Sequence, residues 1–171
     1  MQIKLLLTSI FGVLFLFWAG VRTYDAISFD IHCGDYLKRA ADSNSIELAE
    51  QNLVVVVDYA EHHDLTSGNT GIFWSSPTND VGFWYTNVKS SLTELQKVGQ
   101  KKDATDLERS NVLMKLEKTM LDQGRDSSGV VVPAGISIFP NNIAFFWWGV
   151  LSFVLFAVFG IWSGISAIDR F

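Results

Sequence analysis

The sequence predicts an all-α membrane protein in which two transmembrane helices flank a small extracytoplasmic bundle of about four helices. Two observations predict the membrane helices: residues 142–168 carry no charged side chain, and residues 5–21 form a second apolar run. The third observation is an apolar spacing of three and four residues between those runs, which is typical of helices packed around a core. With 171 residues, the chain has room for one folded domain between the two runs.

Residues 142–168 are predicted to form the second transmembrane helix, followed by a short tail at residues 169–171. A run of 18 or more apolar residues suits a bilayer, because an α-helix satisfies all of its backbone hydrogen bonds internally. Trp147 and Trp148 lie near its start and Trp162 near its end. Tryptophan prefers the headgroup level, so these positions agree with a membrane crossing.

Residues 1–22 are predicted to form the first transmembrane helix, an uncleaved anchor that holds Lys4 and Arg22 near its ends. The alternative is a secretory signal peptide, which needs small residues at the last and third-last positions before its cleavage site. Cleavage after Ala19, Gly20 or Ala26 would put Phe17, Trp18 or Tyr24 at the third-last position. These bulky side chains favour the anchor.

Two anchors place both termini on the same side of the membrane. Lys4 and Arg170 would be cytoplasmic under the positive-inside rule, which predicts a two-pass protein of the plasma (inner) membrane with residues 23–141 outside. In this topology no folded domain is expected on the cytoplasmic side. Any signal would therefore have to leave sideways, through contact with another membrane protein.

The charge of the middle segment excludes one class of partner. Residues 22–142 carry 11 basic and 17 acidic side chains, a net charge of −6. Nucleic-acid phosphates require a basic surface, so no nucleic acid is expected as a partner. Cys33 is the sole cysteine, so no disulfide can form within the chain, and no cofactor is predicted.

The pattern of residues 23–141 predicts the order of elements in the bundle. The alternating residues 28–34 indicate an extended start, and residues 35–42 a short helix. A longer helix should follow Asn44 and Glu47, which have the spacing of a capping pair, and run to about His63 as the central, most enclosed helix.

Two further helices are predicted before the chain returns to the membrane. One covers about residues 80–98, and the other begins at the capping pair Thr105 and Glu108 and is closed by Gly124. Two prolines and the alternating Ile136 and Ile138 then predict an extended connector over residues 125–141.

A cluster of potential metal ligands ends the central helix. Asp58 and His62 are four residues apart on one helical face, and His63 follows directly. A structural metal normally needs four ligands and a catalytic zinc three, so this cluster alone predicts no metal site. A solvated helix end, where histidine complements the helix dipole, explains the same residues.

Aromatic residues gather around the loop before the helix at residues 80–98. Phe73, Trp74, Trp84 and Tyr85 could contact a partner or a ligand, or dip toward the bilayer surface. The simpler interpretation is that they close the end of the bundle, because consecutive aromatics point to different faces of a helix.

Small residues form a possible packing stripe in the second membrane helix. Gly160 and Gly164 have the GxxxG spacing that lets another helix approach closely in lipid. Packing against Gly12 of the first anchor, homodimerisation and docking on another protein are the alternatives. The first of these is the simplest.

Together these features predict a non-enzymatic accessory or interaction subunit of a membrane complex. No GxSxG, HExxH, Walker or Rossmann motif is present. The expected partners are membrane lipid and a membrane protein or a second copy of the chain. The alternatives are an extracytoplasmic ligand sensor that signals laterally through its anchors and a metal-dependent membrane hydrolase.

Overall fold

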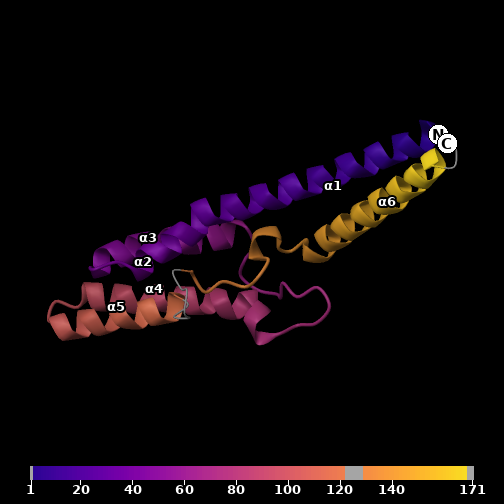
Figure 1. The fold of residues 1–171 in the computed structure, drawn as a ribbon. Helices are drawn as coiled ribbons and strands as arrows, with labels where there is room; N and C mark the ends of the chain where they lie inside the picture. The colour runs from indigo at the N-terminus through magenta and orange to yellow at the C-terminus, as the bar shows by residue number, and fades with distance from the viewer. Residues whose placement is uncertain (1, 122–128, 169–171) are drawn as a thin grey trace. The chain divides into compact units, whose positions relative to one another are not determined.

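The structure is a computed structural model that describes residues 2–121 and 129–168. Over these residues the chain is helical, with no strand and only two isolated β-bridges. Figure 1 shows the helices in chain order. The predicted all-α class is therefore confirmed for this part of the chain. The chain divides into two compact units, residues 1–26 with 141–171, and residues 27–140.

The first unit is an apolar helix pair made of α1 (Gln2–Phe29), up to Ala26, and α6 (Asn142–Ile168). Both helices are long and apolar enough to cross a membrane. They are joined by a hydrogen bond from Nε1 of Trp18 to the carbonyl oxygen of Phe145, at 2.8 Å. Aromatic side chains also pair between the helices, with ring centroids 5.3 Å apart for Phe15 and Phe153 and 5.7 Å for Phe11 and Phe159.

The second unit is a helical bundle of α2 (Asp35–Ala41), α3 (Ile46–His62), α4 (Val81–Gln100) and α5 (Asp106–Met120). Its core contains fully buried aliphatic side chains from each helix and from the segment before α2. The largest of these include Leu37, Ile46, Leu53, Val88, Leu95 and Met120. Because these residues recur at helical spacing, their burial follows from the sequence pattern.

Helix α3 packs against both α2 and α4, and its inward face is buried at Leu53 and Val56. Its other face is open: Leu48 is 49% exposed and Val55 37%. The predicted central position of this helix is confirmed, since it also contacts α5, but these exposed side chains leave one of its faces uncovered. The apolar residues cover much of its circumference, but the neighbouring helices cover only one side.

Side chains cap the three longer bundle helices at their first residues. Asp80 accepts from the backbone N–H of Phe83 at 2.9 Å, and Thr105 accepts from the N–H of Glu108 at 3.2 Å. The predicted cap at Thr105 is confirmed. Helix α3, however, is capped by Ser45 and not by Asn44, because the Ser45 hydroxyl accepts from Leu48 N at 3.3 Å.

The start of the bundle is helical, whereas the sequence pattern predicted an extended segment there. Helix α1 continues to Phe29 and is followed by a π-helical turn, Asp30–Gly34. Phe29, Cys33 and Leu37 are all buried, whereas Ile31 is 53% exposed. A spacing of four residues therefore sets the buried face, and the apparent alternation at Ile31 is incidental.

The return path from α5 is only partly extended. Val130 forms an isolated bridge with Leu121, and the backbone N–H of Val131 donates to the carbonyl oxygen of Met120 at 2.8 Å. Gly135 adopts a left-handed conformation, φ 78°, and leads into a 3-10 turn, Ile136–Ile138, whose two isoleucines are buried. A turn therefore replaces the predicted extension at these positions. The predicted cap Gly124 lies outside the described residues.

Candidate functional site

The loop between α3 and α4 is closed by hydrogen bonds at its base. Nδ2 of Asn69 donates to the carbonyl oxygen of Ser76 at 3.1 Å, and its Oδ1 accepts from the N–H of Gly71 at 2.8 Å. The N–H of Thr70 donates to the carbonyl oxygen of Asn79 at 2.9 Å. Both sides of the loop are therefore fixed to each other by backbone and amide groups.

This loop displays Phe73 and Trp74 to solvent. Phe73 is 65% exposed and Trp74 74%, and their ring centroids are 6.0 Å apart. The tight path of the chain depends on Gly71, where an added Cβ would collide with the carbonyl oxygen of Trp74. A loop built in this way holds two large apolar side chains away from the core, which favours a contact surface over a packing role.

Trp84 and Tyr85 have different roles from the exposed pair, which we name the aromatic tip (Phe73 and Trp74). Trp84 is only 5% exposed and belongs to the core of the bundle. Tyr85 is half-buried, and its hydroxyl donates to Oε1 of Glu61 in α3. The structure therefore separates the four aromatic residues that the sequence grouped. The interpretation that they close the end of the bundle fits Trp84 but not the aromatic tip.

A surface cluster joins α3 to α4 beside Tyr85. Nζ of Lys89 donates to Oε1 of Glu61 at 2.8 Å and to the hydroxyl oxygen of Tyr85 at 2.7 Å. These two donors lower the pKa of Glu61 below its ordinary value, the hydrogen bond from Lys89 being the larger cause and that from Tyr85 the next. Sequence reasoning missed this cluster, although Tyr85 and Lys89 have the spacing of four that brings helical neighbours together.

We expect the Glu61 cluster to make the bundle less stable in acid. Because the pKa of Glu61 is lower in the folded chain than the ordinary value of 4.5, its contribution is present above that pH and is lost as the pH falls through the lowered value. A carboxyl ¹³C NMR titration would measure this pKa. Lys89→Gln should return it toward the ordinary value, and an unchanged titration in that variant would contradict the expectation.

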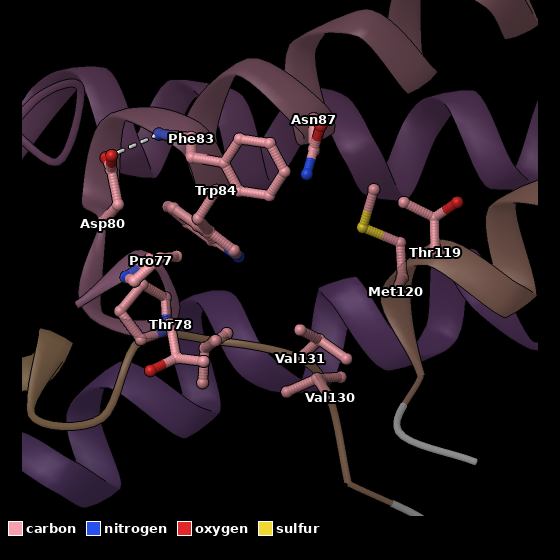
Figure 2. A pocket seen from close by; sticks show the side chains of 12 residues that line it. Pro77, Thr78, Asp80, Phe83, Trp84, Asn87, Thr119, Met120, Val130 and Val131 are labelled. Atoms are coloured by element: carbon pink, nitrogen blue, oxygen red, sulfur yellow. Dashed lines mark hydrogen bonds between the residues drawn. The ribbon is translucent and has the colours of Figure 1, made fainter.

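A pocket of about 540 Å³ lies at the beginning of α4 (Figure 2). Its apolar walls come from Phe83 and Trp84 of α4, Met120 at the end of α5 and residues 130–133 of the return segment. Polar side chains also reach it, from Thr78, Asp80, Asn87 and Thr119. A concave, largely apolar surface with a few polar groups is the usual form of a small-molecule site.

The Trp84 indole is the most unusual group in this pocket. Its Nε1 is buried and has no hydrogen-bond acceptor among the residues that the structure describes. Buried indole N–H groups usually have a partner, because an unmade hydrogen bond costs free energy. The carboxylate of Asp80, by contrast, is already occupied in capping α4. Sequence reasoning raised Trp84 as a possible ligand contact but missed the pocket itself, because residues 77–87, 119–120 and 130–133 meet only after folding.

The potential metal ligands remain on the surface. Asp58, His62 and His63 are all exposed, and the two histidine rings lie 5.6 Å apart, edge to face. Within residues 2–121 and 129–168, no group of three or more His, Cys, Asp or Glu side chains is placed to hold a metal ion. His63 instead packs against Tyr59, with ring centroids 4.2 Å apart.

The glycines of the helix pair differ in how closely the other helix approaches them. A Cβ added at Gly12 would lie 3.2 Å from the Phe156 ring, and one at Gly160 would be in ordinary contact with Thr8, at 3.9 Å. At Gly164 nothing lies within 4 Å. The closest approach is at Gly149, where an added Cβ would lie 2.6 Å from the Trp18 ring. Gly149 was missed because it lies outside any GxxxG spacing.

Comparison with known proteins adds no assignment. No protein-family model matches the chain, and neither a curated protein nor a solved structure matches it. A function for the chain is therefore inferred from the geometry within each of its two units.

Proposed function

We propose that the protein is a non-enzymatic accessory subunit of a membrane complex, anchored by its two apolar helices and binding a partner protein through its helical bundle. The observation that carries this proposal is the aromatic tip, in which Phe73 and Trp74 are 65% and 74% exposed on a hydrogen-bonded loop. Aromatic side chains, Trp above all, dominate the binding energy of protein interfaces.

The rigidity of the loop supports a binding role. A flexible loop loses conformational entropy when a partner orders it, whereas a loop already fixed by the Asn69 amide avoids much of that cost. The free protein, in turn, exposes about two thirds or more of each aromatic side chain to water, which is unfavourable. A partner that covers Phe73 and Trp74 would recover this free energy.

The helix pair supports membrane anchoring in the same proposal. Large apolar side chains such as Leu16 (70% exposed) and Ile161 (64%) cover its outer surface. Lipid is a better solvent than water for such a surface. Lys4 and Arg170 would then be cytoplasmic, and the bundle would lie outside the plasma (inner) membrane. The outer surface of the pair is also where a membrane protein or a second copy would pack.

Photocrosslinking from the aromatic tip tests this proposal in native membranes. A benzoylphenylalanine at position 74 should form an adduct with one protein of defined mass. The same probe at position 107 should not form it, because Leu107 follows the far end of α4, whose 20 residues span roughly 30 Å. Leu107 is a matched control, since it is 70% exposed where Trp74 is 74%.

Two outcomes would contradict the proposed interface. In the first, positions 74 and 107 crosslink the same protein equally, so that the tip has no special role. In the second, the probe at position 74 crosslinks only lipid, so that the tip contacts the bilayer surface and not a protein.

A ligand sensor is the second candidate function, and the pocket beside Trp84 favours it. Helical backbone runs without a break from Gln2 to Ala41, so α1 continues directly into the bundle. In this second proposal, a partner packed against the anchors would receive the signal when a ligand rearranges the bundle.

A further inference from the structure

The Trp84 indole N–H is a buried donor without an acceptor among the described residues. A buried polar group of this kind is unfavourable, and its presence in a folded protein calls for an explanation such as a bound molecule. Only 5% of Trp84 is exposed, and the same side chain lines the pocket at the start of α4. The unmet donor and the pocket are independent observations on one residue.

The donor faces the pocket. Figure 2 shows the nitrogen end of the Trp84 indole turned toward the space between Asn87, Met120 and Val131. Because Nε1 is buried, an acceptor reaches it only after a neighbouring side chain moves. Met120 is the most adaptable neighbour, since an unbranched thioether has several soft rotations.

The lining defines the chemistry of the ligand. Phe83, Met120 and residues 130–133 provide an apolar wall, which fits a compact hydrocarbon body. No Lys, Arg or His is among the described residues that line the pocket, and Asp80 contributes a carboxylate. An anionic ligand is therefore disfavoured, and a cation would leave the Trp84 N–H, which needs an acceptor, unsatisfied.

We propose that this pocket binds a neutral small molecule with an apolar body and a carbonyl oxygen, and that this oxygen accepts a hydrogen bond from Nε1 of Trp84. The carbonyl satisfies the donor without placing a charge in the core. The body of the ligand fills the space between α4, the end of α5 and residues 130–133. The side chain of Asn87 provides a second polar contact at the pocket wall.

This ligand site does not depend on the proposed partner interface. Neither Phe73 nor Trp74 lines the pocket, and neither exposed ring is needed to form it. The crosslinking experiment at position 74 and the ligand experiment at Trp84 can therefore succeed or fail separately.

The test uses two probes of nearly equal shape, 2-adamantanone and 2-methyleneadamantane, of which only the first has an acceptor oxygen. The full chain, with ¹⁵N-labelled tryptophan, is titrated in lipid nanodiscs. Its six tryptophans give six indole N–H signals, and Trp84→Phe identifies the one from Trp84. We expect the ketone to shift this proton downfield in a saturable way and to bind about five- to tenfold more tightly than the methylene analogue.

Two variants separate binding at the pocket from partition into lipid. Trp84→Phe should abolish the preference for the ketone, because it removes the donor and keeps an aromatic ring. Val131→Trp should weaken both probes while leaving the Trp84 signal present, because Val131 lines the pocket and the larger ring fills it. If Trp84→Phe does not fold, the loss of affinity of Val131→Trp for both probes decides the matter without assignment of the Trp84 signal.

Three results would overturn the proposal. The first is the absence of any saturable change at the Trp84 indole with either probe. The second is equal affinity for the two probes, which would show that no hydrogen bond to the ligand forms. The third is undiminished binding to Val131→Trp, which would place the probes elsewhere.

Discussion

Replacing Gly149 with valine is expected to disrupt the α1–α6 pair and lower its stability by about 1–3 kcal/mol through overpacking. The Cβ alone would lie 2.6 Å from the ring of Trp18, so the indole must move. Its movement would also break the hydrogen bond to the Phe145 carbonyl oxygen, now 2.8 Å long. In lipid such a bond contributes about 0.6 kcal/mol on average.

Disulfide formation between cysteines at positions 11 and 159 would report on the pairing, because the stacked phenylalanine rings show that these two positions face each other across the pair. Gly149→Val should lower the yield. Gly164→Val is the matched control in the same helix, because nothing lies within 4 Å of the Cβ position of Gly164. An equal loss of yield in both variants would contradict the packing described for the pair. A loss of association with another chain in Gly164→Val alone would instead assign the GxxxG spacing to an external contact.

Leu53→Ala is expected to destabilise the bundle by about 2–5 kcal/mol, the usual range for a buried leucine. Leu53 is fully buried on the inward face of α3, where α2 and α4 pack against that helix. Its removal leaves a cavity that the neighbouring helices can fill only in part. Because most domains are stable by only about 5–15 kcal/mol, this loss is a large fraction of the total.

Urea unfolding of the full chain in detergent, followed by circular dichroism, would measure this loss. Leu48→Ala is the control: it makes the same chemical change on the same helix, but Leu48 is 49% exposed. Its effect should stay within about 0.5 kcal/mol, as for most surface substitutions. Similar losses in the two variants would mean that the inward face of α3 is assigned incorrectly.

Local signals explain why much of the bundle could be predicted. Asp80 and Thr105 stand directly before helices α4 and α5, and both caps form within the next three residues, so no distant contact is needed. The N-terminal cap of α3 shows where prediction from local sequence fails. Asn44 and Ser45 are adjacent and chemically suitable, and only the backbone path selects Ser45.

Positions that depend on distant contacts could not be predicted. Trp74 and Trp84 are the same residue type in one aromatic-rich stretch, yet Trp74 is 74% exposed and Trp84 5%. The difference arises because Trp84 lies on the face of α4 that packs on the core, while Trp74 lies in the loop. The pocket likewise needs Met120 and residues 130–133 to meet α4, and the approach of Gly149 to Trp18 depends on the register of two helices far apart in sequence.

The bond from the Trp18 indole to Phe145 restricts the motions open to the anchors. Its acceptor lies in the first turn of α6, so a piston-like slide of either helix by one residue, about 1.5 Å, would change the length and angle of this bond and weaken it. Hydrocarbon offers no water to replace the lost partner. Tilting or swivelling of the two helices as one body leaves this bond intact, so we expect α1 and α6 to move together.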